Sequence, residues 1–429
     1  MTVLKVKPRL PIITTLIVIV LGAWILAFVF ARTRRPAPTL DGLEPLLKAR
    51  NFDAVERRLH EFLKSDPNNI RGNMLRAQVA LDREDQDPDL ALESLAKIRP
   101  LNPAMTAVIR LNEGKAFSAL SRYDKAEAAW IEALRLDPLV PEAGWAVLGL
   151  YYVQGRREEA HKLGLALHAS EPDPRDRVQL LLELLRQDAQ PLSADSVITT
   201  LEPVVREHPE DLHSTAALGL AWIRHSRPEQ GLKVLRPLID RFGNYPEAWD
   251  ALLTGLAEAF QFDELTMTLG RLPQAMSKDP RFERHRGVVA QNKRDWPAAA
   301  DAFLLAWQRD PSDAPVLYKL SRMLRAAGRV EEAERFDPRV KAMEAAREEA
   351  FPLFETVNTD PAFGSVPRVT IYQRLADLRE RMGREDEALA WHRLVLKAEP
   401  EDAISLEAIR RLPEAAKPPT LAEYLGAHR

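Results

Sequence analysis

Residues 104–138 read AMTAVIRLNEGKAFSALSRYDKAEAAWIEALRLDP, and this stretch decides the fold. Apolar side chains recur every three or four residues in each half, which is the spacing of two amphipathic helices. Ser121 breaks the pattern and indicates a turn, and Pro138 ends the second helix because proline cannot continue one. Gly114 and Ala126 are small enough for two backbones to approach closely. We therefore predict a helical hairpin.

The same hairpin pattern recurs along most of the chain. Prolines, many of them preceded by an acid, stand at intervals of 34 to 37 residues over the first five positions. They are Pro67, Pro103, Pro138, Pro172 and Pro209, and Pro280 and Pro311 continue the series. A period in the mid-thirties indicates one helical hairpin per unit, and such units bury their apolar faces by stacking into a solenoid.

These hairpins resemble tetratricopeptide repeats. Trp145, Leu148, Gly149 and Tyr152 reproduce the family's W-x2-L-G-x2-Y pattern in a first helix, and Gly155 marks the turn that follows. The small–aromatic–small–proline pattern of the second helix is matched by Ala126, Trp130, Ala133 and Pro138, and again by Ala299, Phe303, Ala306 and Pro311. The resemblance implies an all-α fold, a right-handed α-solenoid of about nine or ten hairpins over residues 41–412.

Three parts of the chain depart from the repeat. Residues 180–209 are irregular because Pro191 breaks the helical pattern there. Residues 330–365 are irregular as well, where Phe336-Asp337-Pro338 predicts an interruption before a longer helix over 339–354. Two interpretations stay open for residues 413–429, a loose tail or a capping segment.

The N-terminal segment predicts a membrane anchor. A basic tail at 1–10 precedes a predicted transmembrane helix at 11–31, and a linker at 32–40 follows it. Residues 11–30 carry no charge and would span roughly 30 Å as a helix, the thickness of a bilayer core. A cleaved signal peptide is the alternative, although its apolar stretch would be shorter, about 7–15 residues. We expect a single-pass protein of the cell (inner) membrane with a periplasmic solenoid, while three basic residues on each flank leave the orientation open.

Composition excludes several classes of function. Residues 1–35 carry six basic side chains and no acid, so residues 36–429 hold −9 against a net charge of −3. That balance lacks the electrostatic footprint of a nucleic-acid binder. The chain has no cysteine, which rules out disulfides, thiol catalysis and cysteine zinc sites. Phosphate-binding, nucleophile-elbow and H-E-x-x-H motifs are missing too, so we expect no catalytic residue, cofactor or metal, and no enzyme.

The candidate site is the groove that first helices line in a solenoid. In each first helix, residues three before and one after the small packing residue should point into the groove. Counting from Gly287, from Ser321 and from the later repeat nominates Arg281, Arg284, Gln291, Asn292, Tyr318, Arg322, Arg325 and Gln373. One hypothesis is a basic groove for an acidic or extended peptide, since arginine forks suit carboxylates. The other is a solvated polar face with no ligand.

Two functions follow from this pattern. The first is a membrane-anchored scaffold that binds protein partners in envelope or secretion-related assembly, with the membrane held by residues 11–31. The alternative is an envelope enzyme, or the regulatory subunit of one, with a groove site including Glu158, His161 or Arg284. Glu158 and His161 form an E-x-x-H motif, but a di-iron site needs two such motifs and further carboxylates, so we expect a structural role.

Overall fold

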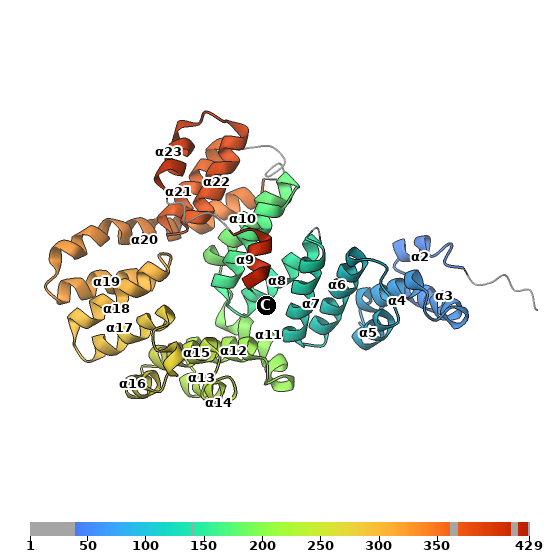
Figure 1. Ribbon diagram of the computed structural model, residues 1–429, viewed down its shortest axis with the longest axis horizontal. Coiled ribbons are helices and arrows are strands. Elements are labelled where there is room, and N and C mark those ends of the chain that lie inside the picture. The colour runs from blue at the N-terminus through green and yellow to red at the C-terminus, as the bar shows by residue number, and fades with distance from the viewer. Residues whose placement is uncertain (1–38, 139, 361–367, 413–418, 428–429) are drawn as a thin grey trace, which may run out of the picture. The chain divides into compact units, whose positions relative to one another are not determined.

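The computed structural model describes residues 39–138, 140–360, 368–412 and 419–427 (Figure 1). Every regular element in this part of the chain is a helix, which confirms the all-α prediction. The predicted membrane helix at 11–31 lies outside the described residues. Among the residues that are described, none of the helices combines the length and the apolar character that crossing a bilayer requires. The chain divides into two compact units, Met1–Leu101 and Asn102–Arg429.

The first unit contains four described helices. They are α2 (Glu44–Lys48), α3 (Phe52–Ser65), α4 (Ile70–Asp82) and α5 (Pro88–Ala96). Leu43, Val55, Leu59 and Val79 form its buried core. Arg76 of α4 forms an ion pair with Glu56 of α3 at 2.9 Å. The helices therefore pack as successive antiparallel neighbours, as short connections require.

The second unit contains the remaining helices. Its first part comprises α6 (Pro103–Ala119), α7 (Tyr123–Leu136), α8 (Pro141–Val153), α9 (Arg157–Ser170), α10 (Pro174–Ala189), α11 (Ala194–Glu207), α12 (Leu212–Arg224), α13 (Pro228–Leu235) and α14 (Leu238–Arg241). The second part comprises α15 (Pro246–Glu258), α16 (Phe262–Gly270), η1 (Gln274–Met276), η2 (Pro280–Phe282), α17 (Glu283–Asn292), α18 (Trp296–Arg309), α19 (Ala314–Ala326), α20 (Val330–Asn358), α21 (Val369–Arg381), α22 (Glu385–Ala398), α23 (Ala403–Arg411) and α24 (Leu421–Ala427).

The α6–α7 hairpin confirms the predicted close contact. A side chain at Gly114 would overlap the indole of Trp130, so only glycine fits there. Trp130 donates from Nε1 to the carbonyl of Leu111 at 3.2 Å, which satisfies the buried N–H. Ala126 is fully buried beside this contact. Helix α7 stops at its cap Asp137, directly before Pro138.

Each regular hairpin turns through one residue in the left-handed backbone region. Gly155 has φ +67°, as expected for the turn after α8. Four successive turns place their left-handed residue 34 positions apart, and only the last of them is glycine. They are Ser226, Phe260, Arg294 and Gly328, with φ between +59° and +79°. The turn geometry therefore repeats more strictly than the residue that adopts it.

Helix α8 packs one residue away from the register of its sequence motif. Gly149 is exposed, and nothing lies within 4 Å of the place where its side chain would be. Leu148 and Tyr151 are fully buried instead. Gly114 precedes Ala126 by 12 residues, and the same offset before Ala160 gives Leu148. The W-x2-L-G-x2-Y match is thus one residue out of register with the packing.

The predicted interruption at Phe336-Asp337-Pro338 is wrong. Helix α20 runs without a break from Val330 to Asn358, with Pro338 and Pro352 inside it. Asp337 accepts hydrogen bonds from Ser321 and Arg325 of α19, which holds this turn of α20 against its neighbour. Tertiary contacts therefore override the helix-breaking tendency of proline here.

The second unit branches after α9. Helix α10 packs against α9 and α20, whereas α11 pairs with α12. Ile198 of α11 and Trp222 of α12 share a core with Tyr123 and Val153, beside α7 and α8. The α11–α12 hairpin thus starts a second stack, in which hairpins continue through α19.

Late helices close this second stack onto the first. Leu181 and Leu185 of α10 share one buried core with Ala346 of α20, Leu375 of α21 and Trp391 of α22. In Figure 1 the orange and red helices α20–α22 accordingly return to the green α10. Residues separated by about half the chain are therefore neighbours in this unit.

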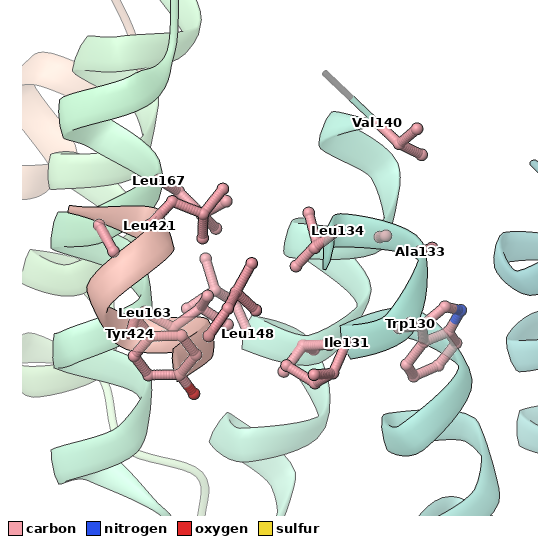
Figure 2. Packing of buried hydrophobic residues seen from close by; sticks show 14 of the residues in the cluster. Trp130, Ile131, Ala133, Leu134, Val140, Leu148, Leu163, Leu167, Leu421 and Tyr424 are labelled. Atoms are coloured by element: carbon pink, nitrogen blue, oxygen red, sulfur yellow. The ribbon is translucent and has the colours of Figure 1, made fainter. Parts of the chain in front are cut away.

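The end of the chain is a packed helix over part of the predicted tail. Leu421, Tyr424 and Leu425 of α24 belong to the core of α7, α8 and α9 (Figure 2). For residues 421–427, the interpretation as a loose tail is wrong. A cap on the last repeat is wrong as well, because α24 packs on α9 and α7.

Candidate functional site

The candidate site follows one face of the first helices α12, α15, α17 and α19, together with η2. We call it the first-helix stripe, and its members occupy equivalent positions in successive hairpins, 34 residues apart. It consists of Arg224, Glu247, Asp250, Thr254, Glu258, Arg281, Arg284, Gln291, Asn292, Tyr318, Arg322 and Arg325. Stacked hairpins bring such positions side by side, so the stripe crosses from one repeat to the next.

Ion pairs link the stripe at the period of the repeat. Arg281 Nη1 lies 2.7 Å from Glu247 Oε1, and the two residues are 34 positions apart. The pair of Arg224 and Glu258, at 2.8 Å, has the same separation. Each arginine therefore meets a carboxylate at its own position in the neighbouring hairpin.

The third pair of this kind is the best enclosed. Arg284 Nη2 lies 2.9 Å from Asp250 Oδ2 and donates to Thr254 Oγ1 at 2.6 Å. A ring nitrogen of His285 lies 2.8 Å from the other oxygen of Asp250. Burial opposes ionisation of Asp250, but Arg284 and His285 hold the pKa of this carboxyl well below its usual range. Asp250 is therefore ionised and fixes the direction of Arg284.

The predicted site residues fall into two groups. Arg281, Arg284 and Arg325 each have an acidic partner, and for Arg325 it is Asp337 of α20. Gln373 lies on α21 and donates to Asp402 Oδ2 at 2.7 Å, so it is engaged away from the other seven residues. The remaining predicted residues, Gln291, Asn292, Tyr318 and Arg322, form no hydrogen bond or ion pair within the described part of the chain.

The α19 end of the stripe carries unpaired positive charge. Tyr318 is 49% exposed, and the Arg322 guanidinium lies 5.6 Å from the centre of its ring. Lys319 lies beside them with its ammonium 5.7 Å from the Phe303 ring, and burial lowers its pKa. Among described residues, neither Arg322 nor Lys319 has a carboxylate within 4 Å. The stripe is thus charge-balanced at α15 and basic at α19.

The predicted groove residues themselves remain a prediction, but the acids beside them were missed. Glu247 and Asp250 precede Arg281 and Arg284 by one repeat period each, so the sequence does contain the signal. The rule that counts from the small packing residue had been applied to α17 and α19 only. Extending it by 34 residues would have found these carboxylates.

The E-x-x-H motif is held in ion pairs. Glu158 lies 2.5 Å from Arg309 of α18 and 2.7 Å from Lys162. His161 has one ring nitrogen 2.7 Å from Asp386 and the other 2.7 Å from Glu387, both on α22. Both nitrogens are therefore occupied by carboxylates of a distant helix, and the motif gives no support to the enzymatic alternative.

A group of buried charges surrounds His161, and we call it the closing cluster. It consists of His161 on α9, Asp188 on α10, Arg379 on α21, Arg384 after it, and Asp386 and Glu387 on α22. Arg379 is fully buried, 2.7 Å from Asp188 and 2.5 Å from Glu387. Burial opposes protonation of His161, yet its two carboxylate neighbours raise its pKa to about 9. The cluster therefore joins opposite charges across the contact between the two stacks.

The space inside the closing cluster is too small for a ligand. The cavity there measures about 10 Å³, which is room for about one water molecule. No group of three or more histidine and acidic side chains suited to a metal ion occurs among the described residues. The cluster is a structural junction by these measures.

Comparisons with known proteins agree with the fold. Residues 111–174, spanning α6 to α9, match the family model described as Tetratricopeptide repeat. This match supports a tetratricopeptide-repeat protein and confirms the resemblance for that segment.

Solved structures of the same fold are distant. A tetratricopeptide repeat protein from Parabacteroides merdae is 10% identical over 71% of this chain and 98% of its own, with a TM-score of 0.30. Human IFIT1, as a dimer with m7Gppp-AAAA, is 13% identical over 88% of this chain and 95% of its own, with a TM-score of 0.35. The P58(IPK) TPR domain is 15% identical over 90% and 97%, with a TM-score of 0.23. Similarities this weak carry no argument about function.

Proposed function

We propose that this chain is a scaffold that binds a protein partner along the first-helix stripe. The observation that carries the proposal is the unpaired, exposed Tyr318–Arg322 pair beside Lys319, at the end of a row of arginines whose charges are already matched. A free arginine fork and an aromatic ring are the side chains that most often anchor protein partners. Repeat proteins of this type typically bind proteins and do not catalyse reactions.

The charge pattern of the stripe favours an extended acidic segment. Arg322 and Lys319 lack carboxylates within the described chain, so acidic side chains of a partner would supply them. Toward α15 the acids Glu247 and Asp250 already neutralise Arg281 and Arg284. A partner would therefore place its acids at α19 and neutral polar groups toward α15, which gives the bound segment a direction.

The ion pairs of the stripe prepare it for binding. Arg284 is held by Asp250 and Thr254, and Arg281 is held by Glu247, so these side chains lose little freedom when a partner arrives. Pre-organised side chains reduce the entropy cost of association. The paired arginines thus serve as a rigid wall next to the free anchors.

We also propose that residues 11–31 anchor the scaffold in the cell (inner) membrane, with the second unit on the periplasmic side. Twenty uncharged residues between two basic flanks support this proposal. Fusing a compartment-sensitive reporter to the C-terminus measures the side directly. Reporter activity only on the cytoplasmic side would overturn the periplasmic assignment, and release of the chain from membranes by signal cleavage would overturn the anchor.

The binding proposal is tested by crosslinking from the stripe. A photoreactive amino acid replaces Tyr318 in the full chain, and adducts are identified in membranes. We expect defined partners with acidic segments, and loss of those adducts when Arg322→Glu is added. The matched control is Arg206→Glu, an exposed arginine of α11 with no ion pair among the described residues. Adducts that survive Arg322→Glu as well as they survive Arg206→Glu would argue against this site.

A further inference from the structure

The C-terminal helix α24 lies on a surface far from its own end of the chain. It begins ten residues after α23 ends, yet it packs against α7 and α9. In Figure 2, Leu421 and Tyr424 lie among Leu134, Leu148, Leu163 and Leu167. A short helix therefore occupies an apolar surface that belongs to two earlier hairpins.

Three side chains make the contact, and they lie on one face of α24. Leu421, Tyr424 and Leu425 stand at positions i, i+3 and i+4, and each is at most 6% exposed. The start of the helix is closed by Thr420 and Glu423, whose side chains bond to each other's backbone N–H in a capping box. This Leu-x2-Tyr-Leu face is how an amphipathic helix binds in a groove.

Helix α24 depends on the surface, but the surface does not depend on α24. A helix of seven residues is unstable alone in water, so α24 forms by docking. The receiving side chains, such as Leu148 and Leu163, also pack against one another within the α7–α9 core. The contact thus has the character of a receptor and a tethered ligand.

A hydrogen-bond chain gives the site a preference for tyrosine. Tyr151 of α8 donates to Glu127 Oε1 at 2.8 Å, and Arg156 pairs with the other oxygen of Glu127 at 2.6 Å. Arg156 and Tyr151 together hold the pKa of Glu127 below its usual value against the effect of burial, so Glu127 is an acceptor only. The proton of Tyr151 is thereby committed, and its oxygen accepts from Tyr424, 3.1 Å away. Phenylalanine at the same place would leave that buried acceptor unused.

We propose that the surface formed by α7, α8 and α9 is a second protein-binding site, which takes an amphipathic helix of a partner with leucine, tyrosine and leucine at i, i+3 and i+4. Helix α24 is the resident competitor that a partner displaces. The proposal is independent of the first-helix stripe, because none of its residues belongs to that stripe.

The test measures exchange at the site in a protein that has already folded. A protease site replaces residues 414–417 of the full chain, and the purified protein is cleaved after folding. A fluorescent peptide of residues 419–429 is then added. We expect the peptide to bind the cleaved protein at least about tenfold more tightly than the uncleaved one, because the tether raises the local concentration of the competitor. Equal binding to both forms, or none to either, would overturn the proposal.

A second variant and two control peptides make the result specific. Leu421→Ala with Leu425→Ala in the uncleaved chain should vacate the site and allow the same binding. A peptide carrying Tyr424→Phe should bind about fivefold more weakly, and one carrying Leu421→Asp should not bind. If the Phe peptide binds as well as the Tyr peptide, the preference for tyrosine is lost. If the double variant forms a dimer that exchanges α24 between copies, the site serves self-association, and the partner proposal fails.

Discussion

The stack α12–α19 and the contact that closes it, around α9, α10, α21 and α22, use the same kinds of side chain in opposite ways. Along the stack, ion pairs such as Arg284 with Asp250 join residues 34 positions apart. In the closing cluster, Arg379 meets Asp188 across 191 positions and His161 meets Asp386 across 225. The first pattern is a one-dimensional array in which each repeat depends on its neighbours. The second makes distant repeats depend on each other.

The largest difference between the two regions is expected on removing a buried charge. Arg379→Ala leaves Asp188 and Glu387 without their shared cation in a fully buried place, and we expect a loss of about 3–5 kcal/mol in the free energy of unfolding. Arg374→Ala on the same helix, 60% exposed, should cost less than about 1 kcal/mol. Urea denaturation of both variants measures this. A loss below about 1 kcal/mol for Arg379→Ala would mean that the closing cluster does not hold the stacks together.

Two histidines should give the regions opposite pH dependences. The folded pKa of His161 is about 9, above the ordinary 6.5, so its contribution is complete below pH 6.5 and is lost as pH rises through 9. At about 1.4 kcal/mol per pKa unit it is worth up to about 3 kcal/mol. Burial lowers the pKa of His285 in the stack, so its contribution is present above about pH 6.5 and is lost as pH falls.

The free energy of unfolding between pH 6 and 10 separates these two contributions. We expect His161→Gln to flatten the alkaline decline that the unmodified protein shows. His285→Gln serves as the comparison and should leave that decline in place. An unchanged alkaline slope in His161→Gln would contradict the assigned role.

Two glycines test the packing register within the regular hairpins. Gly114→Ala places a methyl group against the Trp130 indole, and we expect a loss of about 1–3 kcal/mol. Gly149→Ala points into open space on a helix and should be neutral or stabilise by up to about 1 kcal/mol. Thermal unfolding of the two variants distinguishes these outcomes. Equal losses would restore Gly149 to the helix contact that its sequence motif suggests.

The smallest effect concerns the turns. Phe260 is 77% exposed and holds a left-handed φ of +59°, which costs a side-chain residue roughly 1 kcal/mol. Phe260→Gly should therefore stabilise the protein by up to about 1 kcal/mol, whereas Gly328→Ala, at the equivalent turn, should destabilise it by a similar amount. Differential scanning calorimetry checks both signs. A lower melting temperature for Phe260→Gly would show that its contact with Phe262 outweighs the backbone strain.

The contrast also explains what could be predicted from the sequence. Periodic features such as the turn at Gly155 and the contact of Gly114 with Trp130 are local, so spacing alone reveals them. Motif letters were less reliable than spacing, as the displaced match at Gly149 shows. Pro338 misled because its local tendency was outweighed by contacts of Asp337 with α19.

The closing cluster and the docking of α24 left no readable pattern. His161 and Asp386 lie 225 positions apart, and no period or motif relates them. Leu421, Tyr424 and Leu425 show an amphipathic turn, but a turn that short does not say which surface receives it. Of the candidate site, the arginines on α17 were found by position, whereas their acidic partners required the count to be carried back one more repeat.

Closure has a consequence for how this chain can change in evolution. Open arrays gain or lose whole units at little cost, because each new unit contacts only its neighbours. Here Gly383, in the turn between α21 and α22, abuts the backbone of Pro311 in the turn before α19, and Arg339 of α20 reaches Glu385 at 3.4 Å. Deleting one 34-residue unit between α12 and α19 would carry α22 away from His161. The number of units in this part of the chain is therefore set by geometry, and natural variants should differ in side chains and loops while keeping the same count.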